Sequence, residues 1–153
     1  RQRQMCIRDS NITFEVSNAD KIVLTDAKWM EFMLNQIVSN SIKYKDKTKA
    51  ESYIKISAAE DKKCIVLEIL DNGIGINASD LPRVFDKSFT GENGHEYSKA
   101  TGMGLYIVKK LCDKLGSKVS IESVNGEYTR VKITFYKNDF YKEITDSNES
   151  GSM

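Results

Sequence analysis

Two short segments place paired glycines where backbone N–H groups could hold a ligand. They are DNGIGI at 71–76, which contains Gly73 and Gly75, and TGMGL at 101–105, which contains Gly102 and Gly104. The first pair allows a positive φ angle or the close approach of another group's atoms. The second pair opens a helical pattern, and the free N–H groups and dipole at a helix start favour an anion. Taken alone, the first pair also fits an ordinary turn, and the second also fits a closely packed helix start. The surrounding residues are needed to tell a ligand site from these alternatives.

Three polar residues fall on faces that the sequence pattern predicts to be apolar. At about 100° per residue, Asn40 lies roughly 20° from Met33 and roughly 60° from Ile37 on a helical wheel. Asp71 continues the apolar face of the strand residues before it, and Thr129 shares a face with the apolar residues after it. An unpaired buried charge is very costly, so Asp71 needs a donor from the protein or from a ligand. The three residues fit either internal structural polar groups or the lining of a polar cleft.

Hydrophobic periodicity predicts the elements that position these residues. Strands are expected around Ile12–Val16, Ile54–Ala58, Cys64–Leu70, Val119–Ser123 and Thr129–Tyr136, with a short additional one at Lys21–Leu24. Helices are expected at Ala27–Lys45, capped by Thr25 or Asp26, at Ser79–Phe85, capped by Ser79 or Asp80, and at Met103–Leu115, closed by Gly116. Turns are expected at 60–63 and at Asn125-Gly126. The sum predicts an α+β fold: a two-layer sandwich of one mixed, mainly antiparallel sheet of about five strands, covered on one face by about three helices.

Length and composition bound the class of protein. The 153 residues suit one domain, and the net charge is +1. No basic stripe favours nucleic acid, and no apolar run approaches the roughly 18 residues that span a bilayer, so we expect neither contact from this chain. Cys64 and Cys112, like Cys6, lack metal-ligand spacing and are expected to be reduced thiols, the first two as small hydrophobes. We expect residues 1–10 to be a non-native leader, 11–137 the folded domain and 138–153 a flexible tail.

In order and spacing, four segments resemble the boxes of one ATP-binding family, which is shared by sensor histidine kinases, type II topoisomerases, ATPase chaperones and mismatch-repair ATPases. The segments are QIVSNSIKY at 36–44 (N box), DNGIGI at 71–76 (G1 box), VFDKSF at 84–89 (F box) and TGMGL at 101–105 (G2 box). The resemblance covers roughly Ile12 to Tyr136 and implies the Bergerat fold, a two-layer α/β sandwich. The F box and the long loop 89–101, the expected ATP lid, favour histidine kinases over the other branches. The sequence FTGENG at 89–94 most resembles Firmicutes kinases of the antibiotic-peptide-sensing type.

The resemblance implies ATP and Mg²⁺ as cofactors and gives roles to the matching residues. Asn40 would coordinate Mg²⁺ that bridges the phosphates, and Gln36, one turn earlier, would assist the metal or its water. Asp71 would accept a hydrogen bond from the adenine amino group, while Lys43 and Lys87 would approach the phosphates. The other residues implied to contact ATP are Tyr44, Gly73, Gly75, Ile76 and Thr129 on the adenine side, Gly102, Gly104 and Leu105 at the phosphates, and Phe85, Thr101 and Met103 of the F and G2 boxes.

The acceptor of the family's reaction is absent from this sequence. That acceptor is a histidine on an upstream helical dimerisation domain, whereas the single histidine here, His95, falls in the expected lid. We therefore expect the cytoplasmic, ATP-binding piece of a membrane-anchored, homodimeric bacterial kinase that phosphorylates its own histidine and then a response regulator. Gln36 is a poor general base, which argues against a water-activating ATPase. The alternatives are an ATPase or anti-sigma-type serine kinase of the same superfamily, or a non-catalytic nucleotide-binding module.

Overall fold

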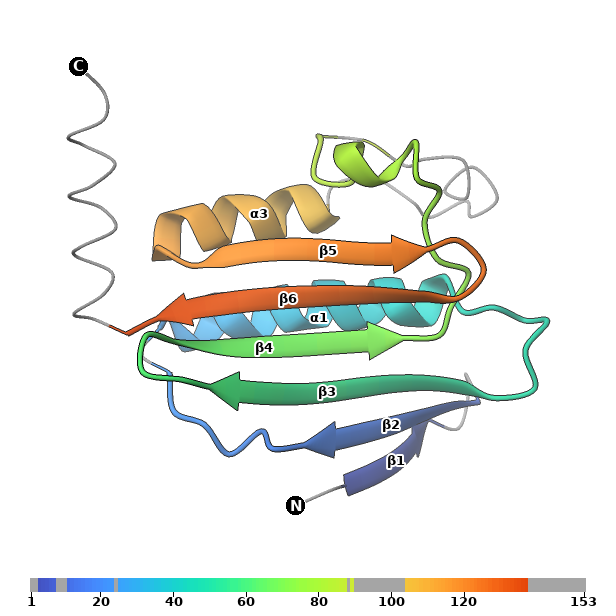
Figure 1. Cartoon of the computed structure of the whole chain (residues 1–153), viewed down its shortest axis with the longest axis horizontal. Helices are drawn as coiled ribbons and strands as arrows, with labels where there is room; N and C mark the ends of the chain where they lie inside the picture. Colours follow the sequence, from blue (N-terminus) through green and yellow to red (C-terminus); the bar gives the residue numbers. More distant parts are fainter. Residues whose placement is uncertain (1–2, 8–10, 24, 88, 90–103, 138–153) are drawn as a thin grey trace.

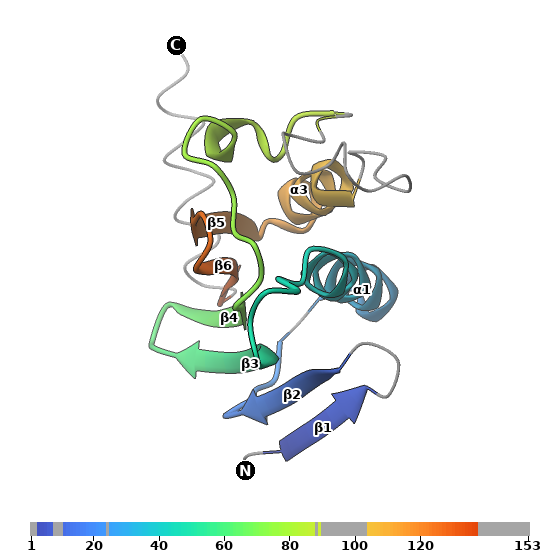
Figure 2. The same ribbon diagram turned by 90° about the vertical axis from the view of Figure 1, so that its right-hand side faces the viewer.

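The computed structural model describes residues 3–7, 11–23, 25–87, 89 and 104–137, and these form two layers. One layer is a six-stranded sheet in the order β1-β2-β3-β4-β6-β5. The other consists of helices α1 (Ala27–Lys43) and α3 (Gly104–Leu115), which both cover the same face of the sheet (Figures 1 and 2). The predicted α+β sandwich is confirmed.

The sheet is mixed but mainly antiparallel. Its strands are β1 (Arg3–Ile7), β2 (Ile12–Ser17), β3 (Ser52–Glu60), β4 (Cys64–Asp71), β5 (Lys118–Val124) and β6 (Tyr128–Tyr136). Only β2 and β3 pair in parallel, as the crossover through α1 between them requires, and all other neighbours pair antiparallel. The five strands predicted from alternation are all present.

Three local predictions were wrong. Arg3–Ile7 pairs with β2 although its sequence predicted no element, because an edge strand needs only backbone groups from its neighbour. Residues 21–23 form no strand, and Ile22 is 87% exposed, so its side chain adds nothing to the core; Leu24 lies outside the described residues. The segment Ser79–Phe85 shortens to a single 3₁₀ turn, η1 (Leu81–Arg83), without a side-chain cap from Asp80.

Local signals explain where the two α-helices begin and end. The Asp26 carboxylate caps α1 by accepting a hydrogen bond from the Trp29 N–H at 3.0 Å, so Asp26 rather than Thr25 is the capping residue. Helix α1 ends at Lys43, two residues before the predicted end. Helix α3 ends before Gly116, whose φ of +70° fits the glycine expected there.

The core lies between the sheet and the two helices. It is formed by Ile12, Phe14, Met33, Ile37, Ile54, Ile69, Val108, Cys112, Val119, Val131, Ile133 and Phe135. The Cys112 Sγ lies 3.6 Å from the Met33 Sδ, joining α3 to α1, and burial raises the pKa of the Cys112 thiol to about 11. Cys112 is thus a small buried hydrophobe, as predicted.

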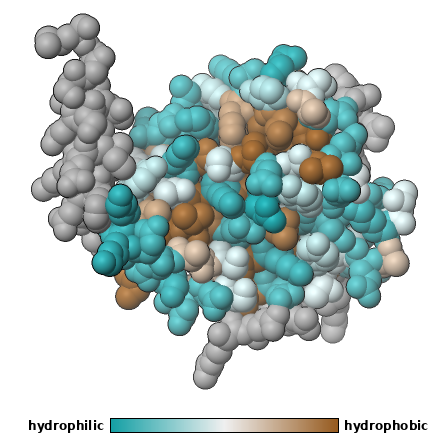
Figure 3. All heavy atoms as spheres, in the orientation of Figure 1, coloured by the Kyte–Doolittle hydropathy of each residue, from teal (hydrophilic) through white to brown (hydrophobic). Residues whose placement is uncertain are grey.

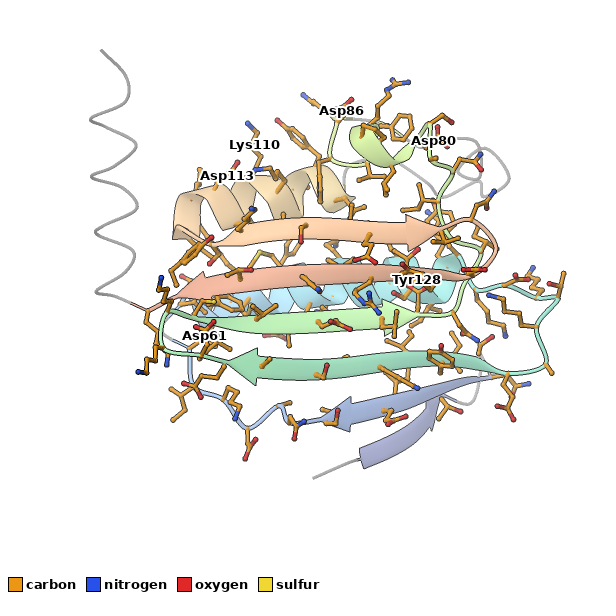
Figure 4. All side chains as sticks on the ribbon, viewed as in Figure 1. Asp61, Asp80, Asp86, Lys110, Asp113 and Tyr128 are labelled. Atoms are coloured by element: carbon orange, nitrogen blue, oxygen red, sulfur yellow. The ribbon has the colours of Figure 1, made fainter. Side chains whose placement is uncertain are left out.

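Within the described part of the chain, no helix lies over the opposite face of the sheet, which carries mixed polar and apolar side chains (Figure 3). On this face, Arg130 pairs with Glu68 at 3.1 Å and with Glu122 at 3.2 Å. Tyr128 is labelled in Figure 4, and its hydroxyl donates a hydrogen bond to Glu122 at 2.7 Å. Because side chains alternate along a strand, Thr129 between Tyr128 and Arg130 points to the helix-covered side.

Candidate functional site

The candidate site is built around a buried carboxylate at the end of β4. Asp71 is 8% exposed and occupies the inward position that the strand period predicts. Its Oδ2 accepts a hydrogen bond from the Ser41 Oγ at 2.8 Å, and its Oδ1 accepts one from the Gly73 N–H at 2.9 Å. The charge that the pattern aimed at the core is therefore partly satisfied by the protein itself.

Burial and hydrogen bonding act on Asp71 in opposite directions. Burial is the largest effect and raises the pKa of its carboxyl above the usual range. The hydrogen bonds from Ser41 and Gly73, and then the positive charge of Lys49, lower this pKa and favour the ionised form. Each of these three groups favours the ionised form, in which Asp71 acts only as a hydrogen-bond acceptor.

Ser41 is a site residue to which the sequence analysis gave no role. The fully buried row of α1 is Met33, Ile37 and Ser41 at spacing four, so the buried polar residue at its end is Ser41. Asn40, which the wheel placed inside the apolar stripe, is only half-buried at the edge of that row. The predicted apolar pattern of this helix repeats every four residues through Met33 and Ile37, and one further step of four reaches Ser41.

Thr129 and Ser123 extend the polar row across the sheet from Asp71. Thr129 pairs directly with Asp71 in the β4–β6 register, and Ser123 pairs with Thr129 in the β5–β6 register. The hydroxyls of Ser123 and Thr129 lie 3.0 Å apart, and the Ser123 Oγ also accepts a hydrogen bond from the Ile76 N–H at 2.9 Å. The predicted inward aim of Thr129 is confirmed, and Ser123 is an addition.

The glycines of the G1 box are required by close approaches. A Cβ on Gly73 would lie 2.5 Å from the carbonyl oxygen of Tyr44, at the end of α1. Gly75 has a φ of +71°, and a Cβ there would clash with the carbonyl oxygen of Val124. Packing thus needs glycine at both positions, and it brings the G1 segment 71–76 against both α1 and β5.

Gly104 joins the G2 box to the N box. A Cβ on Gly104 would lie 2.9 Å from the Gln36 Oε1 and 3.9 Å from the Asn40 Nδ2. The first residue of α3 is therefore beside the two amides of α1 that the resemblance assigns to the metal. Leu105 follows in the same helix and is half-buried, whereas Thr101, Gly102, Met103 and His95 lie outside the described residues.

The other predicted residues occupy the surroundings of these contacts. Lys43 is the last residue of α1, its ammonium lies 5.5 Å from the centre of the Tyr44 ring, and partial burial lowers its pKa. Ile76 is half-buried, and Phe85 packs against the core. Lys87 is exposed, and no described contact places it beside the N box.

The sequence and fold comparisons define the class of this protein. The chain belongs to the family of histidine kinase-, DNA gyrase B-, and HSP90-like ATPases, whose profile matches residues 25–139. It is similar to the catalytic regions of Firmicutes sensor histidine kinases, which confirms the resemblance found in the four boxes.

Three relatives show how much of each protein is shared. The chain is 41% identical over 116 residues to the sensor histidine kinase YxdK of Bacillus subtilis, covering 76% of this chain and 35% of the relative. It is 38% identical over 140 residues to the sensor protein BceS of Halalkalibacterium halodurans, covering 91% and 40%. It is 36% identical over 145 residues to the sensor histidine kinase GraS of Staphylococcus epidermidis, covering 88% and 40%. The chain thus spans well under half the length of the curated relatives it matches.

Solved structures share the fold. The catalytic domain of histidine kinase ThkA matches with a TM-score of 0.68 at 26% identity, covering 85% of this chain and 83% of that chain. The mycobacterial sensor histidine kinase MprB matches with a TM-score of 0.73 at 22% identity, covering 84% and 86%. In addition, neither helix in the described part of the chain has the length and hydropathy needed to cross a bilayer.

Proposed function

We propose that this chain is the catalytic ATP-binding domain of a sensor histidine kinase and presents Mg-ATP for γ-phosphoryl transfer. The observation that carries the proposal is the buried Asp71 carboxylate. Ser41 and Gly73 each donate one hydrogen bond, one to each oxygen, and an ionised carboxylate accepts about four. Asp71 therefore keeps acceptor capacity for the amino group of adenine, with Tyr44, Ile76 and Thr129 around the base.

The phosphates would lie at the other side of α1, beside Gly104. Asn40 would give its amide oxygen to Mg²⁺, with Gln36 as a second candidate, because Mg²⁺ binds oxygen ligands and retains waters and substrate phosphates. The start of α3 adds the positive end of a helix dipole, and Lys43 and Lys87 add charge. Phe85 and the G2 residues Thr101, Gly102, Met103 and Leu105 complete the proposed contacts. Bound Mg²⁺ would supply charge neutralisation on the phosphates.

Neighbouring residues of α1 would serve both ends of the nucleotide. The Asn40 Nδ2 would lie 3.9 Å from a Cβ on Gly104. The hydroxyl of the next residue, Ser41, donates a hydrogen bond to Asp71. A rigid helix thus sets the spacing between the proposed adenine and phosphate sides. Phosphoryl transfer depends mainly on such positioning and on charge stabilisation, so this arrangement suits the reaction.

The acceptor and later partners would belong to the parent protein. A histidine nitrogen on an upstream dimerisation domain would attack the γ-phosphorus, the bond to the β–γ bridging oxygen would break, and ADP would leave. The phosphoryl group would pass to an aspartate of a response regulator. The relatives are named as sensor histidine kinases and sensor proteins, which supports a kinase parent with a phosphoacceptor domain and a response regulator as partner. The proposal extends to a homodimeric, membrane-anchored parent whose catalytic domain lies in the cytoplasm.

Reconstituting the transfer tests the proposal. The chain is mixed with a separately prepared acceptor domain, MgCl₂ and ATP labelled on the γ-phosphate. We expect acid-labile label on the acceptor histidine, and none when that histidine is replaced by glutamine. Label on serine, or steady ADP release without the acceptor, would instead assign the chain to the serine kinases or the ATPases.

A further inference from the structure

Lys49 makes contacts that no box of the family explains. It lies in the loop between α1 and β3, and its side chain is 26% exposed. Its Nζ donates to the carbonyl oxygens of Asn72 at 2.8 Å, Gly73 at 3.2 Å and Glu127 at 2.9 Å. A lysine ammonium has three donors, and here all three have backbone acceptors.

These three acceptors belong to two segments that are distant in sequence. Asn72 and Gly73 are in the G1 segment, and Glu127 is in the turn between β5 and β6. Loop carbonyls need partners when they are partly buried, and a charged donor makes a stronger hydrogen bond than a neutral one. One ammonium therefore bridges the G1 segment and the β5–β6 turn.

The loop around Lys49 is itself held in place. The Asp46 carboxylate accepts hydrogen bonds from the Thr48 hydroxyl at 2.6 Å and the Thr48 N–H at 2.9 Å, and its other oxygen lies 4.0 Å from the Lys49 Nζ. These bonds from Thr48, followed by the charge of Lys49, lower the pKa of Asp46. The Lys49 ammonium is thus presented from a fixed turn.

The segments that Lys49 joins also form the proposed adenine side. The Gly73 N–H bonds Asp71, the Gly126 N–H bonds the Ile74 carbonyl at 2.7 Å, and Ser123 holds Ile76. A shift of the G1 segment away from the turn would displace these donors from the polar row. It would also move Asp71 relative to the Lys49 ammonium, whose positive charge favours the ionised carboxylate.

We propose that Lys49 is a positioning residue for nucleotide binding: its ammonium fixes the G1 segment against the β5–β6 turn and so sets affinity for the adenosine part of ATP. It acts through Asn72, Gly73 and Glu127. This inference rests on the proposed function, and it adds a residue outside the four boxes.

Calorimetric titration with Mg-ATP and Mg-ADP tests this role in the wild type and in three variants. Lys49→Met keeps most of the aliphatic stem but removes the ammonium, and Lys49→Arg restores a donor cation. Lys47→Met is the matched control, because Lys47 is an exposed lysine of the same loop. All titrations are done well below the melting temperature of each variant, so that folding does not limit binding.

We expect Lys49→Met to weaken both nucleotides by a similar factor of about ten, or about 1.4 kcal/mol. Lys49→Arg should recover most of this loss, and Lys47→Met should leave affinity unchanged. Unchanged affinity in folded Lys49→Met would overturn the positioning role, and so would a loss seen with ATP only, which would indicate contact with the γ-phosphate. Wild-type protein that binds neither nucleotide would overturn the proposed function instead.

Discussion

Replacing Ser41 by alanine tests whether the buried Asp71 carboxylate is held ionised by its hydrogen bonds. The change removes the hydroxyl that donates to the Asp71 Oδ2 at 2.8 Å, at a position that is 8% exposed. A hydrogen bond to a charged group contributes about 1.5–3 kcal/mol. We therefore expect Ser41→Ala to lower the free energy of unfolding by about this amount at a pH above the folded pKa of Asp71, where the carboxylate is ionised.

The pH dependence of that loss is the sharper part of the prediction. Burial raises the pKa of Asp71 in the folded state. Protonation of Asp71 therefore contributes to the free energy of unfolding in full below the unfolded pKa, and this contribution is lost as pH rises through the folded pKa. Removing Ser41 raises the folded pKa further. The difference in free energy of unfolding between wild type and Ser41→Ala should therefore be largest above the folded pKa of Asp71. It should shrink as pH falls through that pKa, because the carboxyl is then protonated in both proteins.

Urea denaturation at several pH values between neutral and acid measures this difference. Ser39→Ala is the matched control, because Ser39 is an exposed serine of the same helix. In an Asp71→Asn background the charge is gone, so Ser41→Ala should cost markedly less. A loss that is independent of pH, or equal in the two backgrounds, would refute the reasoning.

Three further changes separate the adenine side, the metal and the backbone of the site. Asp71→Asn should weaken ATP binding by at least about tenfold, because the adenine amino group meets an amide in place of a carboxylate; unchanged affinity by calorimetry would rule out the adenine role. Asn40→Asp should perturb Mg²⁺-dependent binding most, so ATP titrations with MgCl₂ and with EDTA should differ in the size of the loss; an equal loss in both would count against the metal assignment. Gly75→Ala should destabilise the fold by about 1–3 kcal/mol in thermal unfolding, because Gly75 has a φ of +71° and a Cβ would meet the Val124 carbonyl, whereas Gly126→Ala, at a φ of +80° with open space around it, should cost less. Equal losses at the two glycines would mean that the φ angle alone sets the cost.

Much of this architecture follows from local patterns. The alternation of side chains along β4 predicted that Asp71 points to the helix-covered face of the sheet, where it is buried. The same alternation along β6 predicted that Thr129 points to this face, and Thr129 pairs directly with Asp71 in the sheet register. The N-cap of α1 at Asp26 and the glycine after α3, Gly116, could also be predicted, because helix caps depend on residues that are close in sequence. Residues that act through their neighbours along the chain were therefore predictable.

The missed features depend on contacts between distant segments. Lys49 bonds carbonyls that are 23, 24 and 78 residues away, and no periodicity marks a loop lysine for that role. The β1 strand uses backbone pairing, which its side chains do not encode. Ser41 was missed for a different reason. It lies on the buried face of α1, but a serine is not apolar and so does not show up in a hydrophobic pattern.

The crossover from β2 through α1 to β3 has a consequence for how the site comes into being. Its residues come from α1, from the end of the β3–β4 hairpin and from the β5–β6 hairpin with the start of α3, so no single supersecondary unit contains it. The polar row exists only after all three units have docked and the long chain closures between them have been made. A ligand that binds this row would select the fully assembled state over every partly opened one, so its binding free energy would add to the cooperativity of the whole domain.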